Sequence, residues 1–245
     1  MCGATGAFTR RGSVYDGMPY TRFSDLELLV VEKALRLVWH EAPQRFNIHC
    51  INFNTANEEQ ISSALYLVFN DLWANDRHLL ADLAKVFLPV PIYDGPSGAV
   101  DYLGHELKFR PDLAFRRNYT DAGISTIDSS LFIEAKLVER GKTMGWYCGT
   151  GLSKFVRGTY AWAMPQAMML GYVRNTTQIL PHSLATHLAP LQKRDQYCLK
   201  EGPKPFPLSG FTNRSYLTLH NRPWLYPGTK VSPGPISVLH LWLSV

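Results

Sequence analysis

The eight residues 131–138 constrain this chain most, because they form an apolar run that also holds an acid and a base. The run reads LFIEAKLV, and its apolar residues favour a buried β-strand. Glu134 and Lys136 are two residues apart, so on a strand both side chains leave the same face. Burying a carboxylate and an ammonium costs free energy unless each finds a partner or a ligand. The run therefore predicts a strand that carries a functional site.

A second strand-like run, residues 109–116, carries one acid in its middle. This acid is Asp112, which lies 22 residues before Glu134. Carboxylates on neighbouring strands are the hard oxygen ligands that Mg²⁺ prefers, and the carbonyl of Ala135 could add a third oxygen. Lys136 would then contact the attacking water and help to orient or deprotonate it. Such a site indicates phosphodiester hydrolysis, which requires a neutralised phosphate and a nucleophilic water.

Pro111-Asp112 followed by Glu134-Ala135-Lys136 resembles the motif of the PD-(D/E)XK nuclease superfamily, which has the restriction-endonuclease-like fold. The resemblance implies an α/β fold with an αβββαβ core. Its mixed central sheet would be flanked by helices, with additions at both ends of the chain. The resemblance also implies a Mg²⁺ cofactor, for which Mn²⁺ could substitute.

Members of this superfamily often carry a further metal-binding glutamate on the first core helix, and here that position corresponds to Glu58. Glu58 lies three residues before Ile61 and seven before Leu65, so it borders the buried face of its helix. Glu59 points more to the side and is the second candidate. An ordinary first-turn acid, stabilised by the helix dipole, remains the alternative for Glu58. Some branches have a glutamine on the helix after the lysine strand, and Gln166 could be its counterpart.

Periodicity and capping residues predict the order of elements around these residues. The predicted helices cover 24–41, 58–72, 76–87 and 153–175, the last kinked or split by Pro165. The predicted strands cover 100–107, 109–116, 130–138, 215–220 and 236–245. A glycine-bearing loop is expected over 141–151. Residues 46–53 allow either a short strand or an irregular loop, and 176–208 show no clean period.

The expected organisation is one domain in three parts. Residues 1–53 form an N-terminal arm and a helix that packs on the core. Residues 54–175 form the nuclease core, the part that the resemblance covers. Residues 176–245 form a C-terminal extension that completes the sheet.

The chain is mildly basic, with 25 Lys and Arg residues against 20 Asp and Glu and a net charge of +5. This balance fits a nucleic-acid partner, although many proteins without one share it. Near the predicted site, the basic residues that could contact backbone phosphates are Arg110, Arg116, Arg117, Lys154 and Arg157. Each of them could equally be a solvated surface charge. The nearby aromatic residues 146, 147, 160 and 162 could stack on bases or pack in the core.

Several classes of protein are disfavoured by what the sequence lacks. Residues 1–22 have no apolar signal-peptide core, and no apolar stretch reaches 18 residues, so a cytoplasmic protein without a membrane span is expected. The four cysteines are not closely spaced, which disfavours a zinc site and a disulfide scaffold.

The favoured interpretation is a Mg²⁺-dependent endonuclease that acts on DNA in restriction, phage defence or repair. A homodimer or a partner subunit is expected, since cutting both strands of a duplex suits two sites related by a two-fold axis. The sequence does not decide whether the substrate is DNA or RNA, or whether the activity is that of an endonuclease or an exonuclease. The alternative is a non-catalytic nucleic-acid-binding or assembly protein on the same fold, which the complete set of Asp112, Glu134 and Lys136 disfavours.

Overall fold

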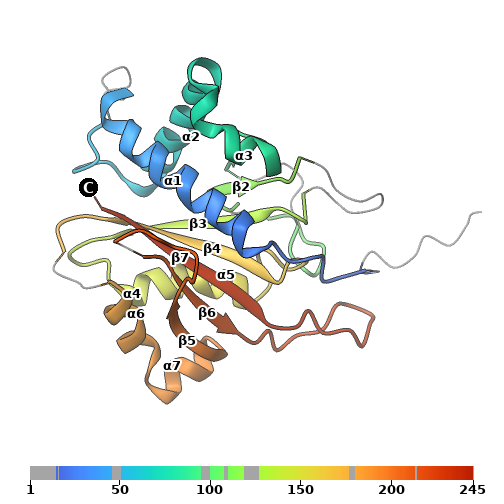
Figure 1. The fold of residues 1–245 in the computed structure, drawn as a ribbon. Coiled ribbons are helices and arrows are strands. Elements are labelled where there is room, and N and C mark those ends of the chain that lie inside the picture. The colour runs from blue at the N-terminus through green and yellow to red at the C-terminus, as the bar shows by residue number, and fades with distance from the viewer. Residues whose placement is uncertain are drawn as a thin grey trace, which may run out of the picture.

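The computed structural model describes residues 15, 17–45, 51–94, 100–107, 110–118, 127–176, 180–212 and 214–244. A seven-stranded mixed sheet passes through the molecule in the order β1-β2-β3-β4-β7-β6-β5 (Figure 1). The strands are β1 Ile92–Tyr93, β2 Leu113–Phe115, β3 Leu131–Val138, β4 Gln166–Val173, β5 Leu199–Pro205, β6 Tyr216–His220 and β7 Ile236–Ser244. The three central strands β3, β4 and β7 are parallel, and the other neighbouring pairs are antiparallel.

Helices cover both faces of this sheet. They are α1 Asp25–Arg45, α2 Glu58–Asn75, η2 Arg77–Leu80, α3 Ala81–Val86, α4 Met144–Trp146, η3 Tyr147–Leu152, α5 Ser153–Val156, α6 Leu180–Leu188 and α7 Leu191–Gln196. Figure 1 shows α1, α2 and α3 on one face and α4, α5, α6 and α7 on the other. Every residue of β3 and β4 is buried, as expected of strands covered on both sides. The predicted α/β class, with a mixed sheet flanked by helices, is confirmed.

The predicted second helix begins at the residue its capping signal indicates. Asn57 accepts a hydrogen bond from the N–H of Gln60, and the Gln60 side chain accepts one from the N–H of Asn57. This capping box satisfies two of the N–H groups that a helix start leaves free. It fixes the first turn of α2, which holds Glu58 and Glu59, over the sheet. In the middle of the helix, Ser62 hydrogen-bonds Tyr172 of β4 at 2.9 Å.

The register of two strands brings the predicted acids together. Strands β2 and β3 are antiparallel, with Leu113 opposite Ile133. Asp112, one residue before β2, therefore lies at the level of Glu134. Lys136 follows Glu134 on the same face of β3, because side chains alternate along a strand.

The helix predicted over 153–175 is wrong. Helix α5 ends at Val156, and Gln166–Val173 is the strand β4, buried between β3 and β7. A strand buried on both faces is a continuous apolar run, which periodicity alone does not distinguish from a buried helix. Pro165 marks the start of the strand and not a kink in a helix.

Other local predictions also differ from the structure. The loop expected over 141–151 contains α4 and most of the π-helix η3, and β5 lies in a region without a predicted strand. The segment 100–107 has an isolated bridge at its ends and no regular strand. The strand predicted over 109–116 is reduced to the short β2. Residues 46–50 lie outside the described residues.

Among the helices of the described ranges, none has the length and apolar character needed to cross a membrane.

Candidate active site

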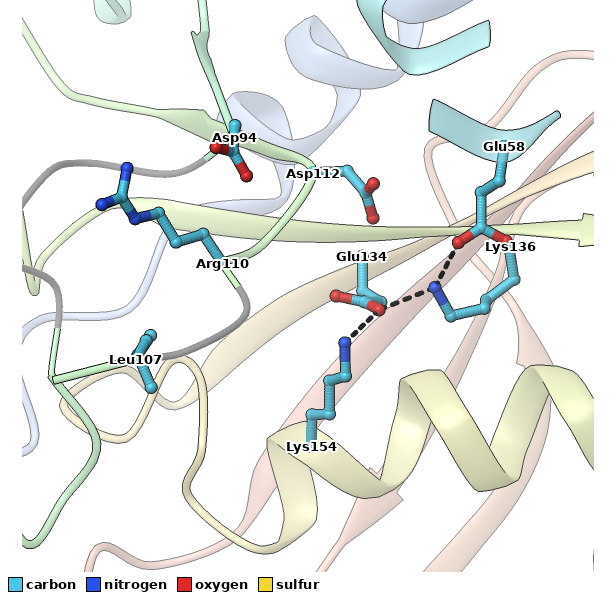
Figure 2. A pocket seen from close by; sticks show the side chains of 8 residues that line it. All are labelled: Glu58, Asp94, Leu107, Arg110, Asp112, Glu134, Lys136 and Lys154. Atoms are coloured by element: carbon cyan, nitrogen blue, oxygen red, sulfur yellow. Dashed lines mark hydrogen bonds and ion pairs between the residues drawn. The ribbon is translucent and has the colours of Figure 1, made fainter. Parts of the chain in front are cut away.

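A polar pocket of about 420 Å³ opens beside the N-terminus of α2, between β2, β3 and α5 (Figure 2). Its lining residues are Glu58, Asp94, Leu107, Arg110, Asp112, Glu134, Lys136 and Lys154. The structure thus brings together all four residues that the sequence predicted as the catalytic set. They come from the first residue of α2, from the residue before β2 and from the middle of β3.

Asp112 is half-buried at the edge of the pocket. One of its carboxylate oxygens accepts a hydrogen bond of 2.7 Å from the backbone N–H of Ala135. Burial, followed by the negative charge of Glu134, raises the pKa of Asp112 to about 7, although Lys136 and the Ala135 N–H act in the opposite direction. A shift of this size in a pocket is typical of functional sites. The ionised form of this carboxyl group therefore lacks sufficient compensation in the protein alone.

Glu134 is buried, and its two carboxylate oxygens have different surroundings. Oε1 lies 2.7 Å from Lys136 Nζ and 2.6 Å from Lys154 Nζ. Oε2 is buried and has no hydrogen-bond partner among the described residues. A buried carboxylate oxygen without a partner carries a desolvation penalty, which a bound ligand would relieve.

Lys136 uses all of its hydrogen-bonding capacity within the protein. Its ammonium group contacts Glu58 Oε1 at 2.6 Å, the Ala135 carbonyl at 2.6 Å and Glu134 Oε1 at 2.7 Å. An ammonium group has three N–H donors, so these three oxygens account for all of them. Although burial acts against it, the carboxylates of Glu134, Asp112 and Glu58 raise the pKa of Lys136 above its ordinary value.

Glu58 connects the helix layer to the sheet. As the first residue of α2, it accepts a hydrogen bond from Lys136 through Oε1 and one of 2.9 Å from the Leu137 N–H through Oε2. Glu59, the next residue, is exposed and does not line the pocket. Of the two candidates, the structure therefore places Glu58 in the site.

A π-helical turn carries the chain past Lys136. Gly151 lies in this turn, η3, and a Cβ atom there would collide with Met169 and lie 3.2 Å from Lys136 Cγ. A glycine thus permits η3 to pack closely against the side chains of Met169 and Lys136. The next helix, α5, places Lys154 at the pocket, where its ammonium donates to Glu134 Oε1 at 2.6 Å and to the Tyr160 hydroxyl at 3.3 Å.

The other basic residues lie in different surroundings. Arg110 lines the pocket, Arg157 is exposed in the turn after α5, and Arg116 is half-buried. Arg117 has a structural contact, an ion pair of 2.9 Å with Glu27 at the start of α1. The predicted phosphate contacts of these four arginines stay predictions.

Two residues differ in role from what the sequence indicated. Asp94, which lies outside every helix and strand predicted from the sequence, lines the pocket, and its N–H donates to the Asp112 carbonyl at 3.1 Å. Its backbone φ of 54° is unusual for a residue other than glycine. Gln166 is on β4 and not on a helix, and its side-chain oxygen accepts a hydrogen bond from the Phe23 N–H. No spacing in the sequence signals the approach of Asp94, because it depends on the register of β1 with β2, which places Tyr93 opposite Leu113.

The donor atoms of the pocket are compatible with Mg²⁺. In the described part of the chain, no group of three His, Cys, Asp or Glu side chains is arranged to hold a metal ion. The available oxygens are the carboxylate of Asp112, the unpartnered Oε2 of Glu134 and the carbonyl of Ala135. Mg²⁺ is commonly bound through one or two carboxylates while it keeps several waters, so this set fits it. The set does not fit zinc, which prefers Cys and His.

Comparison with known proteins gave no match to this chain from family models, curated proteins or solved structures.

Proposed function

We propose that this protein is a Mg²⁺-dependent nuclease with a restriction-endonuclease-like core, and that DNA is its substrate. The observation that carries the proposal is the unpartnered, buried Oε2 of Glu134 next to Asp112, whose pKa is raised to about 7. Both features are unfavourable in the protein alone, and a bound cation would relieve both.

The order of elements supports the same proposal. Helix α2 and the short helices η2 and α3 after it are followed by β1, β2 and β3, then by the helical segment α4 to α5, and then by β4. With η2 and α3 taken as additions, this order is compatible with an αβββαβ core. Asp112 precedes the second strand of that series, and Glu134 and Lys136 lie on the third, as the motif requires.

Each residue has a defined part in the proposed reaction. Asp112, Glu134 and the Ala135 carbonyl would hold Mg²⁺, which supplies charge to neutralise the phosphate and to acidify a water. Glu58 and Lys136 fix one another and hold the oxygens of Glu134 in place. Hydrolysis adds the oxygen of one water to phosphorus and breaks one P–O ester bond. The leaving oxygen takes up a proton, so the products are a phosphomonoester and an alcohol.

The test is cleavage of supercoiled plasmid and linear DNA in Mg²⁺, Mn²⁺ or EDTA, with an RNA oligonucleotide beside them. We expect nicking or cutting that requires a divalent ion and that disappears in Asp112→Ala, Glu134→Ala and Lys136→Ala. Glu58→Ala should lower the rate more than its matched neighbour Glu59→Ala. Folded wild-type protein that cuts no nucleic acid in either metal would refute the proposal, and metal-independent DNA binding would then favour a binding protein.

A further inference from the structure

We infer that Lys154 is a catalytic residue of this site, and that it donates a hydrogen bond to the phosphate undergoing hydrolysis. The inference rests on the proposed nuclease function and adds a residue that the PD-(D/E)XK motif does not contain. All three N–H donors of Lys136 contact protein oxygens, so none is left for a phosphate.

Lys154 differs from Lys136 in this respect. Among the described residues its ammonium has two polar partners, Glu134 Oε1 and the Tyr160 hydroxyl, and the second contact is long, at 3.3 Å. One donor is therefore open to the pocket that Lys154 lines. Its side chain is also 27% exposed, against 7% for Lys136, so it can reach a bound substrate.

The position of Lys154 suits a phosphate bound at the proposed cation site. Figure 2 shows Lys154 reaching Glu134 from α5, whereas Lys136 reaches the same carboxylate along β3. A phosphate next to a cation on Glu134 would therefore lie within reach of Lys154. Phosphoryl transfer spreads negative charge over the non-bridging oxygens, and a fixed positive donor there stabilises the transition state.

The surrounding structure holds Lys154 in this place. Its ammonium lies 4.9 Å from the centre of the Tyr160 ring, which fixes the end of the side chain. The turn after α5 is packed just as tightly, since a Cβ at Gly158 would lie 2.6 Å from the Trp224 ring and 2.9 Å from the Tyr102 ring. A catalytic group benefits from such support because little reorganisation is needed when charge develops.

A purely structural role for Lys154 predicts a different result. If Lys154 only neutralised Glu134, a bound cation would replace its charge. Loss of the lysine would then have no effect on the rate once Mg²⁺ is saturating. A phosphate contact predicts a lower rate at saturating Mg²⁺ and saturating DNA.

The experiment measures single-turnover cleavage by wild type and Lys154→Gln at saturating Mg²⁺ and DNA, with DNA affinity measured separately in Ca²⁺. Glutamine retains an N–H donor on a polar side chain and removes the charge. We expect the cleavage rate to fall about 100-fold to 1000-fold, as when one transition-state donor is removed. DNA affinity should change by less than about threefold. Lys154→Arg should recover part of the rate. Lys85→Gln, at an exposed lysine paired with Asp82, is the matched control and should leave the rate unchanged.

The outcomes separate the two proposals. Wild-type protein that cleaves while folded Lys154→Gln matches it would overturn the role of Lys154 and leave the nuclease intact. A variant whose rate is normal at saturation but whose DNA affinity is lower would also overturn it, since Lys154 would then only bind. If Lys154→Gln does not fold, Lys154→Met decides, because methionine keeps the length of the side chain without the charge or the donor, and a wild-type rate in that variant would overturn the role of Lys154. Wild-type protein that cleaves nothing would overturn the proposed function and this inference together.

Discussion

At the scale of single residues, the pocket has unfavourable electrostatics in the protein alone. Asp112 is next to Glu134, and burial and that neighbouring charge both oppose its ionisation. Buried charged groups of this kind lower the free energy of unfolding, and proteins retain them at sites whose activity requires them. The ionised carboxylate of Asp112 should therefore lower the stability of the fold at neutral pH.

Replacing Asp112 by asparagine should accordingly stabilise the metal-free protein. The pKa of Asp112 is raised from 3.8 to about 7 by folding. Protonated Asp112 therefore contributes to the free energy of unfolding. This contribution is complete below pH 4 and is lost as the pH rises through 7, where the folded protein releases the proton. At pH 8 we expect Asp112→Asn to gain about 1–3 kcal/mol in free energy of unfolding, measured by urea denaturation in EDTA.

The pH dependence of that gain is the stricter part of the prediction. The difference between Asp112→Asn and wild type should shrink towards zero as the pH falls to 4. Asp82→Asn, at an exposed acid paired with Lys85, should show no such trend. A variant less stable than wild type at pH 8 would contradict the electrostatic description of Asp112.

At the scale of elements, the start of α2 sets the position of Glu58. The capping box of Asn57 and Gln60 fixes the first turn of this helix, and Glu58 is the first residue within it. Glu58 in turn contacts Lys136 and the N–H of Leu137 on β3. Capping and site geometry are thus coupled through one helical turn.

Removing the cap should therefore affect both stability and activity. Asn57→Ala should lower the free energy of unfolding by about 1 kcal/mol, the usual cost of a lost N-cap. It should also slow cleavage, because Glu58 loses its fixed backbone. Asn57→Ser should recover both properties. Asn75→Ala at the opposite end of α2, where the side chain contacts Asp71, is the control for cleavage. If Asn57→Ala loses stability but cleaves at the wild-type rate, the N-cap does not determine the geometry of the site.

Elements were predictable from the sequence where local signals agreed with the fold. Strand β3 has an apolar frame, and α2 has its caps and its helical period, so both were found together with Asp112, Glu134 and Lys136. Strand β4 was missed because burial on both faces removes the alternation that marks a strand. The contact of Lys154 with Glu134 was missed for a different reason. It depends on a π-helical turn and a close approach at Gly151, and neither has a period in the sequence.

At the scale of the whole molecule, a buried chain of hydrogen bonds joins the sheet to η3. His220 Nδ1 lies 2.8 Å from the Tyr197 carbonyl and must donate to it, so its Nε2 accepts from Thr218. Thr218 then accepts from His240 Nε2 at 2.8 Å, and His240 Nδ1 accepts from the Tyr147 hydroxyl at 3.0 Å. Each of these hydrogen bonds therefore has one direction, and both imidazoles must be neutral for the series of hydrogen bonds to form.

This buried series of hydrogen bonds should make the stability of the protein sensitive to mild acid. Burial lowers the pKa of His220 to about 4 and that of His240 to about 3, below the ordinary value of 6.5. Their stabilising contribution is complete above pH 6.5 and is lost as the pH falls towards 4. At pH 5 we expect a loss of about 2 kcal/mol from each histidine, because the unfolded chain binds the protons.

The measurement is urea unfolding between pH 7 and 5. It is best made in the Asp112→Asn variant, since Asp112 contributes with the opposite sign over this range. The exposed His78→Gln is the control and should follow the same curve. Equal stability at pH 7 and pH 5 would show that the two imidazoles are not held neutral.

The position of β7 in the sheet has a consequence for how the chain folds as it is synthesised. Strand β7, residues 236–244, lies between β4 and β6, so the middle of the sheet is completed by a segment made long after the strands beside the pocket. A ribosome that has passed residue 176 has produced every acid and lysine of the pocket, but one edge of β4 is still unpaired. An open apolar edge of this kind is prone to pairing with other chains. Nascent chains that pause between residues 176 and 236 should therefore be the population that most needs a chaperone.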